Sequence, residues 1–258
     1  MTHPCICLNG PEMGYLQQFF QEVFLESPAF RNHPENSFLK AQELKAHPEV
    51  KNFGGFHLTD AARPSPDVKI QLTQGYRHET YLDEESGSSV PVIMAAASRE
   101  ILFPLFIELI QELGDSVDVV LESSHDHETN GHVDFYREQI DTPVLVSALW
   151  GFEDLLLNDG CTGIAVLNPK TPQEVQFDEH KLLISYGNPL APFESLLQDS
   201  NVFANESMSF ITEADHVHTS SDEFRRQFEQ LRTQLGIDSD FGSANQYPGE
   251  SGEGELNF

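Results

Sequence analysis

The sequence predicts an α/β protein of the α+β kind, built on a mixed or antiparallel β-sheet. Apolar residues recur with a period of two in some segments and at spacings of three and four in others, which are the periods of strands and of helices. The chain has 258 residues, of which 39% are hydrophobic, so it can bury a core without relying on disulfides. A constant shift along the sequence also aligns its two halves, which indicates an internal duplication.

Residues 1–67 are predicted to form an N-terminal helical segment and a long connection. Residues 15–26 place their apolar side chains on one helical face, and a second helical patch covers residues 38–46 and ends before Pro48. Gly54-Gly55 and Pro64-Ser65-Pro66 are residues typical of turns. We expect these helices to pack as an extra layer on the rest of the protein.

Residues 68–143 are predicted to form a first ββαβα unit. Its first strand alternates in polarity, and Ser98 can cap the helix that follows the second strand, with Pro104 implying a kink or a later start. The predicted elements are strands at 68–73, 90–97 and 117–121, and helices at 98–113 and 133–139.

Residues 144–237 are predicted to form a linking helix and a second unit, which together with the first unit makes one compact domain. A capping box at residues 220–223 opens the last helix, which runs to Leu235. Residues 238–258 are rich in Gly, Ser and Glu and nearly free of apolar residues, so we expect a disordered acidic tail. The predicted elements are helices at 144–157, 193–198 and 220–235, and strands at 163–167, 175–186 and 208–212.

The duplication is predicted from a 91-residue shift, which places Val90 on Lys181. The same shift places residues 115–127 on residues 206–218 without a gap, so that each half carries the pattern Glu-x-x-His-x-His after a predicted strand. Two duplicated units pair naturally about a pseudo-twofold axis, with helices on one face of the sheet.

The charge of the chain excludes several classes of partner. Its formal net charge is −28, so it repels phosphate backbones and anionic membrane surfaces. We therefore expect no nucleic-acid or membrane partner. Solubility is the simplest explanation of the charge, and a basic protein partner or mimicry of nucleic acid are the alternatives.

The cysteines and the N-terminus favour a cytoplasmic protein. The chain has three cysteines, an odd number that does not form a disulfide framework, which indicates a reducing compartment. Cys161 has no basic neighbour in sequence and is predicted to be a buried structural thiol. No signal peptide is evident, and no apolar run is long enough to span a bilayer.

The repeated pattern supplies the candidate metal ligands. Histidines two apart on a strand point the same way, so each pair can offer two imidazoles to one ion, and zinc suits nitrogen and carboxylate ligands. Glu122 and Glu213 are the candidate catalytic bases. Alternatively, these polar residues simply serve a junction between a strand and a helix. The candidate ligands are His125, His127 and His132 in the first half, and Asp215, His216 and His218 in the second.

One family motif was compared with the first of these patterns. Ser124-His125-Asp126-His127 resembles the opening of the metallo-β-lactamase metal motif. That motif continues with Asp and His, where this chain has Thr129 and Asn130. The ligands of the second metal are therefore missing, and the sequence is not assigned to that family.

Two hypotheses for the function follow. The first is a non-enzymatic binding or regulatory protein that contacts a protein or a small ligand, because P-loop, GxGxxG and GxSxG motifs are missing from the sequence. The alternative is a zinc-type, metal-dependent hydrolase that uses one or both Glu-x-x-His-x-His sites. The short run Asp178-Glu179-His180 is interpreted as a solvent-facing strand edge.

Overall fold

The structure is a computed structural model that describes residues 51–65, 68–82, 89–125 and 133–237. The predicted N-terminal helices, the histidines at 127 and 132 and the predicted disordered tail all lie outside these residues. None of the described helices is both long enough and apolar enough to cross a membrane.

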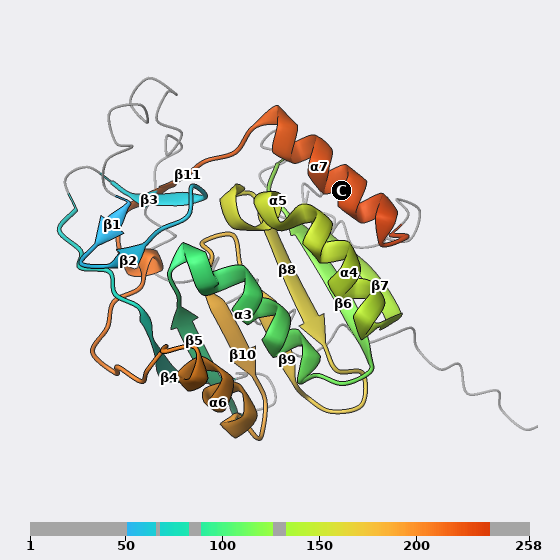
Figure 1. Cartoon of the computed structure of the whole chain (residues 1–258), viewed down its shortest axis with the longest axis horizontal. Helices are drawn as coiled ribbons and strands as arrows, with labels where there is room; N and C mark the ends of the chain where they lie inside the picture. Colours follow the sequence, from blue (N-terminus) through green and yellow to red (C-terminus); the bar gives the residue numbers. More distant parts are fainter. Residues whose placement is uncertain (1–50, 66–67, 83–88, 126–132, 238–258) are drawn as a thin grey trace, which may run out of the picture.

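A seven-stranded antiparallel sheet forms the centre of the described chain (Figure 1). The strand order is β4-β5-β10-β9-β8-β6-β7, and every neighbouring pair is antiparallel. The antiparallel alternative of the sequence prediction is thus confirmed. The strands are β4 (Gly75–Leu82), β5 (Ser89–Ala96), β6 (Ser116–Ser123), β7 (Val133–Asp141), β8 (Thr162–Leu167), β9 (Glu174–Phe177) and β10 (Leu183–Tyr186).

The helices lie on one face of this sheet (Figure 1). They are α3 (Arg99–Gln111), α4 (Thr142–Leu149), α5 (Glu153–Asn158), α6 (Ala191–Asp199) and α7 (Asp222–Gln234), with short 3-10 turns η2 (Trp150–Phe152) and η3 (Ile211–Glu213). Two small antiparallel sheets pair β1 (Asn52–Phe53) with β2 (Phe56–His57), and β3 (Ala62–Pro64) with β11 (His216–His218).

The alternation of side chains along the strands divides the core in two. Ile93 and Leu183 belong to the larger apolar cluster, which also contains the buried side chains of the helices. Their strand neighbours Val92 and Ile184 belong to a second cluster together with Phe210. Successive strand residues point to opposite faces, so the sheet packs apolar groups on both sides.

Several predicted elements are confirmed. The predicted capping box at 220–223 is displaced by one residue: the N-cap of α7 is Ser221, not Ser220, and it accepts a hydrogen bond from the Phe224 amide. Strands β5, β6 and β8 and helices α3 and α6 match their predicted ranges within a few residues. The predicted helix at 144–157 is interrupted at η2, which contains Gly151. Pro104 lies inside α3 without ending it.

Four of the predicted elements are wrong. Residues 133–139 form β7 rather than a helix, because an edge strand with charged residues on its exposed side lacks a clear apolar period. Residues 68–73 and 208–212 are not strands: only a bridge between Leu72 and Ser209 joins them. Their apolar side chains belong to the second core cluster instead. The predicted strand at 175–186 is two strands, β9 and β10, joined by a tight turn.

The duplicated units are not confirmed. Residues 115–123 lead into and form β6, which lies between β7 and β8 in the large sheet. The matching residues 206–214 contain a turn and η3, and β11, which follows them, pairs with β3 in a separate small sheet. Glu122 and Glu213 therefore do not occupy equivalent positions, and no pseudo-twofold relation between these elements follows.

A buried carboxyl group lies on the sheet face opposite the helices. Val175 and Phe177 point into the cluster beneath the helices, so Glu174 and Gln176 on the same strand point the other way. The Glu174 side chain is buried, and burial raises the pKa of its carboxyl to about 8. Ionisation of this group therefore opposes folding.

We predict that this group makes the protein less stable as the pH rises from about 5 to about 8. Below the folded pKa, Glu174 keeps its proton in the folded state and loses it on unfolding. The free energy of unfolding therefore falls by up to ~1.4 kcal/mol per pH unit. Thermal melts from pH 5 to 9 should show a smaller loss of stability in Glu174→Gln than in the parent. The exposed Glu112→Gln serves as the control and should keep the parental slope. Equal slopes in all three proteins would contradict the assignment.

Candidate metal centre

Three histidine side chains converge at one place in the structure. His180 lies in the turn between β9 and β10, and His216 and His218 lie on β11. One ring nitrogen from each lies within 4.8 Å of the corresponding nitrogens of the other two. Because His216 and His218 are two residues apart on a strand, their rings point the same way, as the sequence predicts.

Backbone pairing brings β11 to this position. Thr219, which follows β11, donates to the Ala61 carbonyl at 2.7 Å and accepts from the Gly160 amide at 2.8 Å. A Cβ atom at Gly160 would collide with the Ala61 carbonyl and would lie 3.1 Å from the Cβ of His218. Glycine at position 160 therefore permits three chain segments to meet.

The turn that carries His180 is fixed by Asp178. Its Oδ1 accepts from the Leu182 amide at 2.7 Å, and its Oδ2 lies 2.8 Å from His180 Nδ1. Lys181 takes a left-handed backbone conformation with φ of 66°, which closes the tight turn. The carboxylate thus sets both the backbone of the turn and the orientation of the ring.

Each of the three imidazoles uses Nδ1 for a hydrogen bond and directs Nε2 elsewhere. His216 Nδ1 donates to the Ala214 carbonyl at 2.7 Å, and His218 Nδ1 donates to the Gly160 carbonyl at 2.6 Å. In neutral rings with this tautomer, Nε2 carries a lone pair. The Nε2 atoms of His216 and His218 lie 3.2 Å apart, so two lone pairs face each other, an arrangement that a shared cation stabilises.

The surroundings keep two of the rings neutral. Burial, with the neighbouring His180, lowers the pKa of His216 to about 4, and burial also lowers the pKa of His218. Burial acts the same way on His180, but the charge and hydrogen bond of Asp178 outweigh it and raise the pKa of that ring. Neutral imidazole is the form that binds metal ions.

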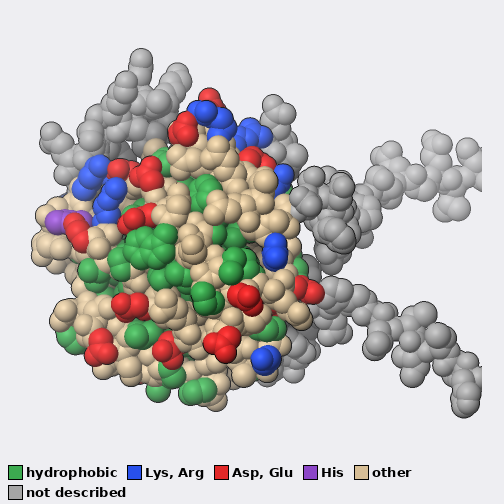
Figure 2. Space-filling model, turned by 45° about the vertical axis from the view of Figure 1, so that its right-hand side comes forward, with side chains coloured by type: hydrophobic (Ala, Val, Ile, Leu, Met, Phe, Trp, Pro, Cys, Tyr) green, Lys and Arg blue, Asp and Glu red, His purple; other side chains and the backbone are tan. Residues whose placement is uncertain are grey.

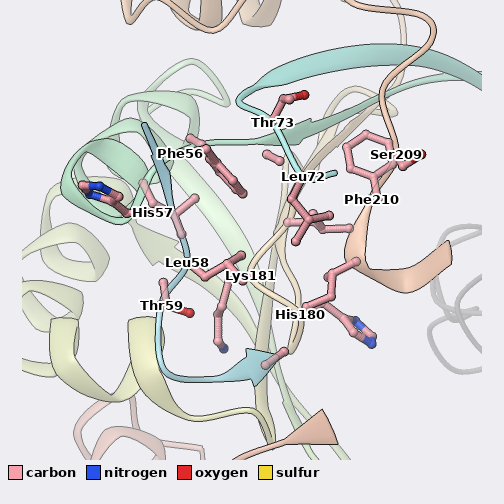
Figure 3. Close-up of a pocket in the computed structure, with 16 residues that line it drawn as sticks. Phe56, His57, Leu58, Thr59, Leu72, Thr73, His180, Lys181, Ser209 and Phe210 are labelled. Atoms are coloured by element: carbon pink, nitrogen blue, oxygen red, sulfur yellow. The ribbon is translucent and has the colours of Figure 1, made fainter. Parts of the chain in front are cut away.

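An apolar pocket borders the centre (Figure 3). Phe56, Leu72 and Phe210 line it, and Figure 3 shows the His180 ring at its edge, turned away from Phe56. Lys181 also lines the pocket; its Nζ donates to the Thr162 carbonyl at 2.8 Å, and burial lowers its pKa to about 8. The His180 ring is therefore directed away from the interior of the pocket (Figure 3).

Of the predicted ligands, His216 and His218 are brought together and His125 is not. His125 Nε2 lies 2.9 Å from Asp159 Oδ2, and its Nδ1 lies 2.8 Å from Ser123 Oγ. Ser123, His125 and Asp159 have buried side chains, so this network holds the end of β6 against the end of α5 and does not present a nucleophile. Cys161 is buried as predicted, and burial raises its thiol pKa to about 11.

The predicted carboxylates have other partners. Glu122 accepts from Gln176 Nε2 at 2.9 Å across Gly163, whose missing side chain leaves room for the carboxylate. Glu213 pairs with Arg77 at 2.5 Å. The backbone carbonyl of Asp215 accepts from the Ser65 amide, and its side chain does not belong to the group of converging ligands.

The third converging histidine, His180, is not among the residues that the sequence predicts, because the pattern at 178–180 favours a solvent-facing strand edge. Its ring is buried beside Asp178 and is not solvent-facing. The available signal was the run of polar residues from 178 to 181 between two apolar stretches, which is typical of a hairpin turn. What the sequence could not indicate is that this turn meets β11.

No model of a known protein family matches the chain, and the comparisons with curated proteins and with solved structures gave no match either. The function must therefore be argued from the geometry of the site.

We predict that Gly160→Ala disturbs the centre and lowers stability by about 1–3 kcal/mol, because the new methyl group has to displace packed backbone. Denaturant unfolding measures the loss. Gly151→Ala is the matched control, since a Cβ at that position meets no atom within 4 Å. If both substitutions lower stability by the same small amount, the close backbone approach at Gly160 does not require glycine.

Proposed function

We propose that this chain is a metal-binding protein that holds one zinc-type divalent ion between His180, His216 and His218. The observation that supports this most strongly is the shared orientation of the three rings. All three Nδ1 atoms meet a carboxylate or a carbonyl. The Nε2 atoms of His216 and His218 lie 3.2 Å apart, and one ring nitrogen of His180 lies within 4.8 Å of the ligand nitrogens of both. Metal-binding histidines commonly have such outer partners, which fix the tautomer and the ring orientation.

The ligand type supports a zinc-type ion. Imidazole nitrogen suits Zn²⁺ and neighbouring transition metals, whereas Mg²⁺ and Ca²⁺ prefer oxygen. An ion at this place would tie the β9–β10 turn to β11, whose histidines lie 36 and 38 residues after His180. Its binding free energy would then stabilise the fold. A metal of this kind suits a binding or regulatory protein without catalytic activity.

A metal-dependent hydrolase is the second candidate. Three protein ligands are the usual number at a catalytic zinc, where water or substrate provides the fourth. Glu179 precedes His180, its charge acts on His216 and His218, and its Oε2 accepts from Ser124 Oγ at 3.2 Å. It is a better placed base than Glu122 or Glu213, whose carboxylates contact Gln176 and Arg77. Zinc-dependent hydrolysis of p-nitrophenyl acetate that is lost in Glu179→Gln would favour this candidate.

We predict that the purified protein takes up one equivalent of Zn²⁺ and that Asp178→Asn weakens the binding about 10–100-fold. Asparagine keeps an oxygen for the Leu182 amide but removes the charge beside His180. Titration calorimetry measures both affinities. His57→Gln, which alters a histidine paired with Glu100 outside the centre, should bind like the parent. If the Asp178→Asn and parent proteins bind zinc with equal affinity, Asp178 does not support zinc binding through His180.

His125→Gln separates the observed centre from the site predicted in the first half of the sequence. The substitution should lower stability, because it removes the buried contact with Asp159. It should leave the zinc affinity within about twofold of the parent, a change too small to indicate a lost ligand. A loss of zinc uptake in the folded variant would show that His125 is a ligand and would contradict the proposed set.

A further inference from the structure

The exposed side of α4 and η2 carries no charged residue. It presents Val144 and Trp150, whose exposed fractions are 57% and 50%, together with Pro143, Ser147 and Gly151. These five residues are called the Trp150 patch. A surface helix normally has charged or polar residues on its outer side, and a helix that is apolar all round is normally buried. The Trp150 patch is therefore a candidate for coverage by a partner.

Trp150 is held in a fixed orientation. Its ring meets the fully buried ring of Phe103 on α3 edge-to-face, with the centroids 5.1 Å apart. It is the only tryptophan in the chain. Tryptophan is enriched among the residues that dominate binding energy at protein interfaces, and an ordered ring loses little entropy on binding.

The border of the patch is acidic on the side of α3 and α5. Glu108 and Glu112 lie exposed on α3 and just after its end, and α5 begins with Glu153 and Asp154. Glu100, at the start of α3, is already paired with His57. Figure 2 shows hydrophobic side chains gathered on one face of the molecule, with acidic groups and some basic groups around them.

Basic groups near this border are few and have partners. Between Arg99 and Lys170 the chain has one Lys or Arg, Arg137, which donates to the Leu235 carbonyl. On the other side of α4, helix α7 bears Arg226 and Arg232, which pair with acidic residues of the same helix. Arg99, at the start of α3, pairs with Asp60. The exposed charged side chains further along α3 are therefore those of Glu108 and Glu112.

We propose that the Trp150 patch binds an amphipathic helix of a partner protein, whose apolar stripe covers Val144 and Trp150 and whose Lys and Arg residues face Glu108 and Glu112. Charge complementarity selects a basic partner, and the apolar centre supplies the buried contact. This surface is separate from the histidine centre and does not depend on a bound metal ion.

Trp150 itself reports the binding, since no other tryptophan contributes to the fluorescence. The probe is an 18-residue helical peptide of Leu and Lys with Leu at helical spacing, and the matched peptide has Glu in place of Lys. The Lys peptide should shift the emission of the full-length protein to shorter wavelength and bind at least 10-fold more tightly than the Glu peptide. Val144→Asp should remove this binding, and Glu108→Lys combined with Glu112→Lys should weaken it about 10-fold.

The control is Phe203→Ala, which removes an exposed aromatic ring outside the patch and should leave binding unchanged. Circular dichroism checks that each variant folds. Equal affinity for the two peptides, no spectral shift, or unchanged binding by folded Val144→Asp would each overturn the proposal. Concentration-dependent dimerisation that Val144→Asp abolishes would also overturn it, because a second copy would then be the occupant.

Discussion

The hydrogen bond from His218 Nδ1 to the Gly160 carbonyl, 2.6 Å long, joins the parts of the structure on which the candidate site depends. It links β11 to the segment between α5 and β8, and the backbone bonds of Gly160, Thr219 and Ala61 surround it. The bond also fixes the tautomer of His218, so that Nε2 is directed toward His216 and His180. Without this close approach at glycine, three distant chain segments could not present three nitrogens to one point.

One part of the site is set by neighbouring residues on a strand and could be predicted from the sequence, and the other part is set by tertiary contacts and could not. His216 and His218 are neighbours on one strand, so their spacing alone indicated a shared direction. His180 joins them only through tertiary structure, since Asp178 orients it from the β9–β10 turn and Gly160 holds β11 nearby. Glu122 lies near the end of the buried strand β6 and His125 follows it, a spacing that suits a ligand pair. The tertiary structure instead gives them Gln176 and Asp159 as partners.

The elements of the fold likewise differ in whether their own sequence pattern identifies them. Buried elements with strong periodicity, such as α3 and β6, were predictable because burial of one face dictates their pattern. β7 was not, because it is an edge strand with few buried side chains. The apparent repeat arose because the apolar residues within 206–214 have another role: Met208, Phe210 and Ile211 cover the second face of the sheet instead of forming a strand within it.

X-ray absorption of the zinc-loaded protein tests whether three imidazoles bind one transition-metal ion. We expect one zinc per chain with three imidazole nitrogens at about 2.0–2.1 Å, and loss of this imidazole shell in folded His216→Ala. A shell made of oxygen atoms alone, or an unchanged imidazole shell in His216→Ala, would contradict it.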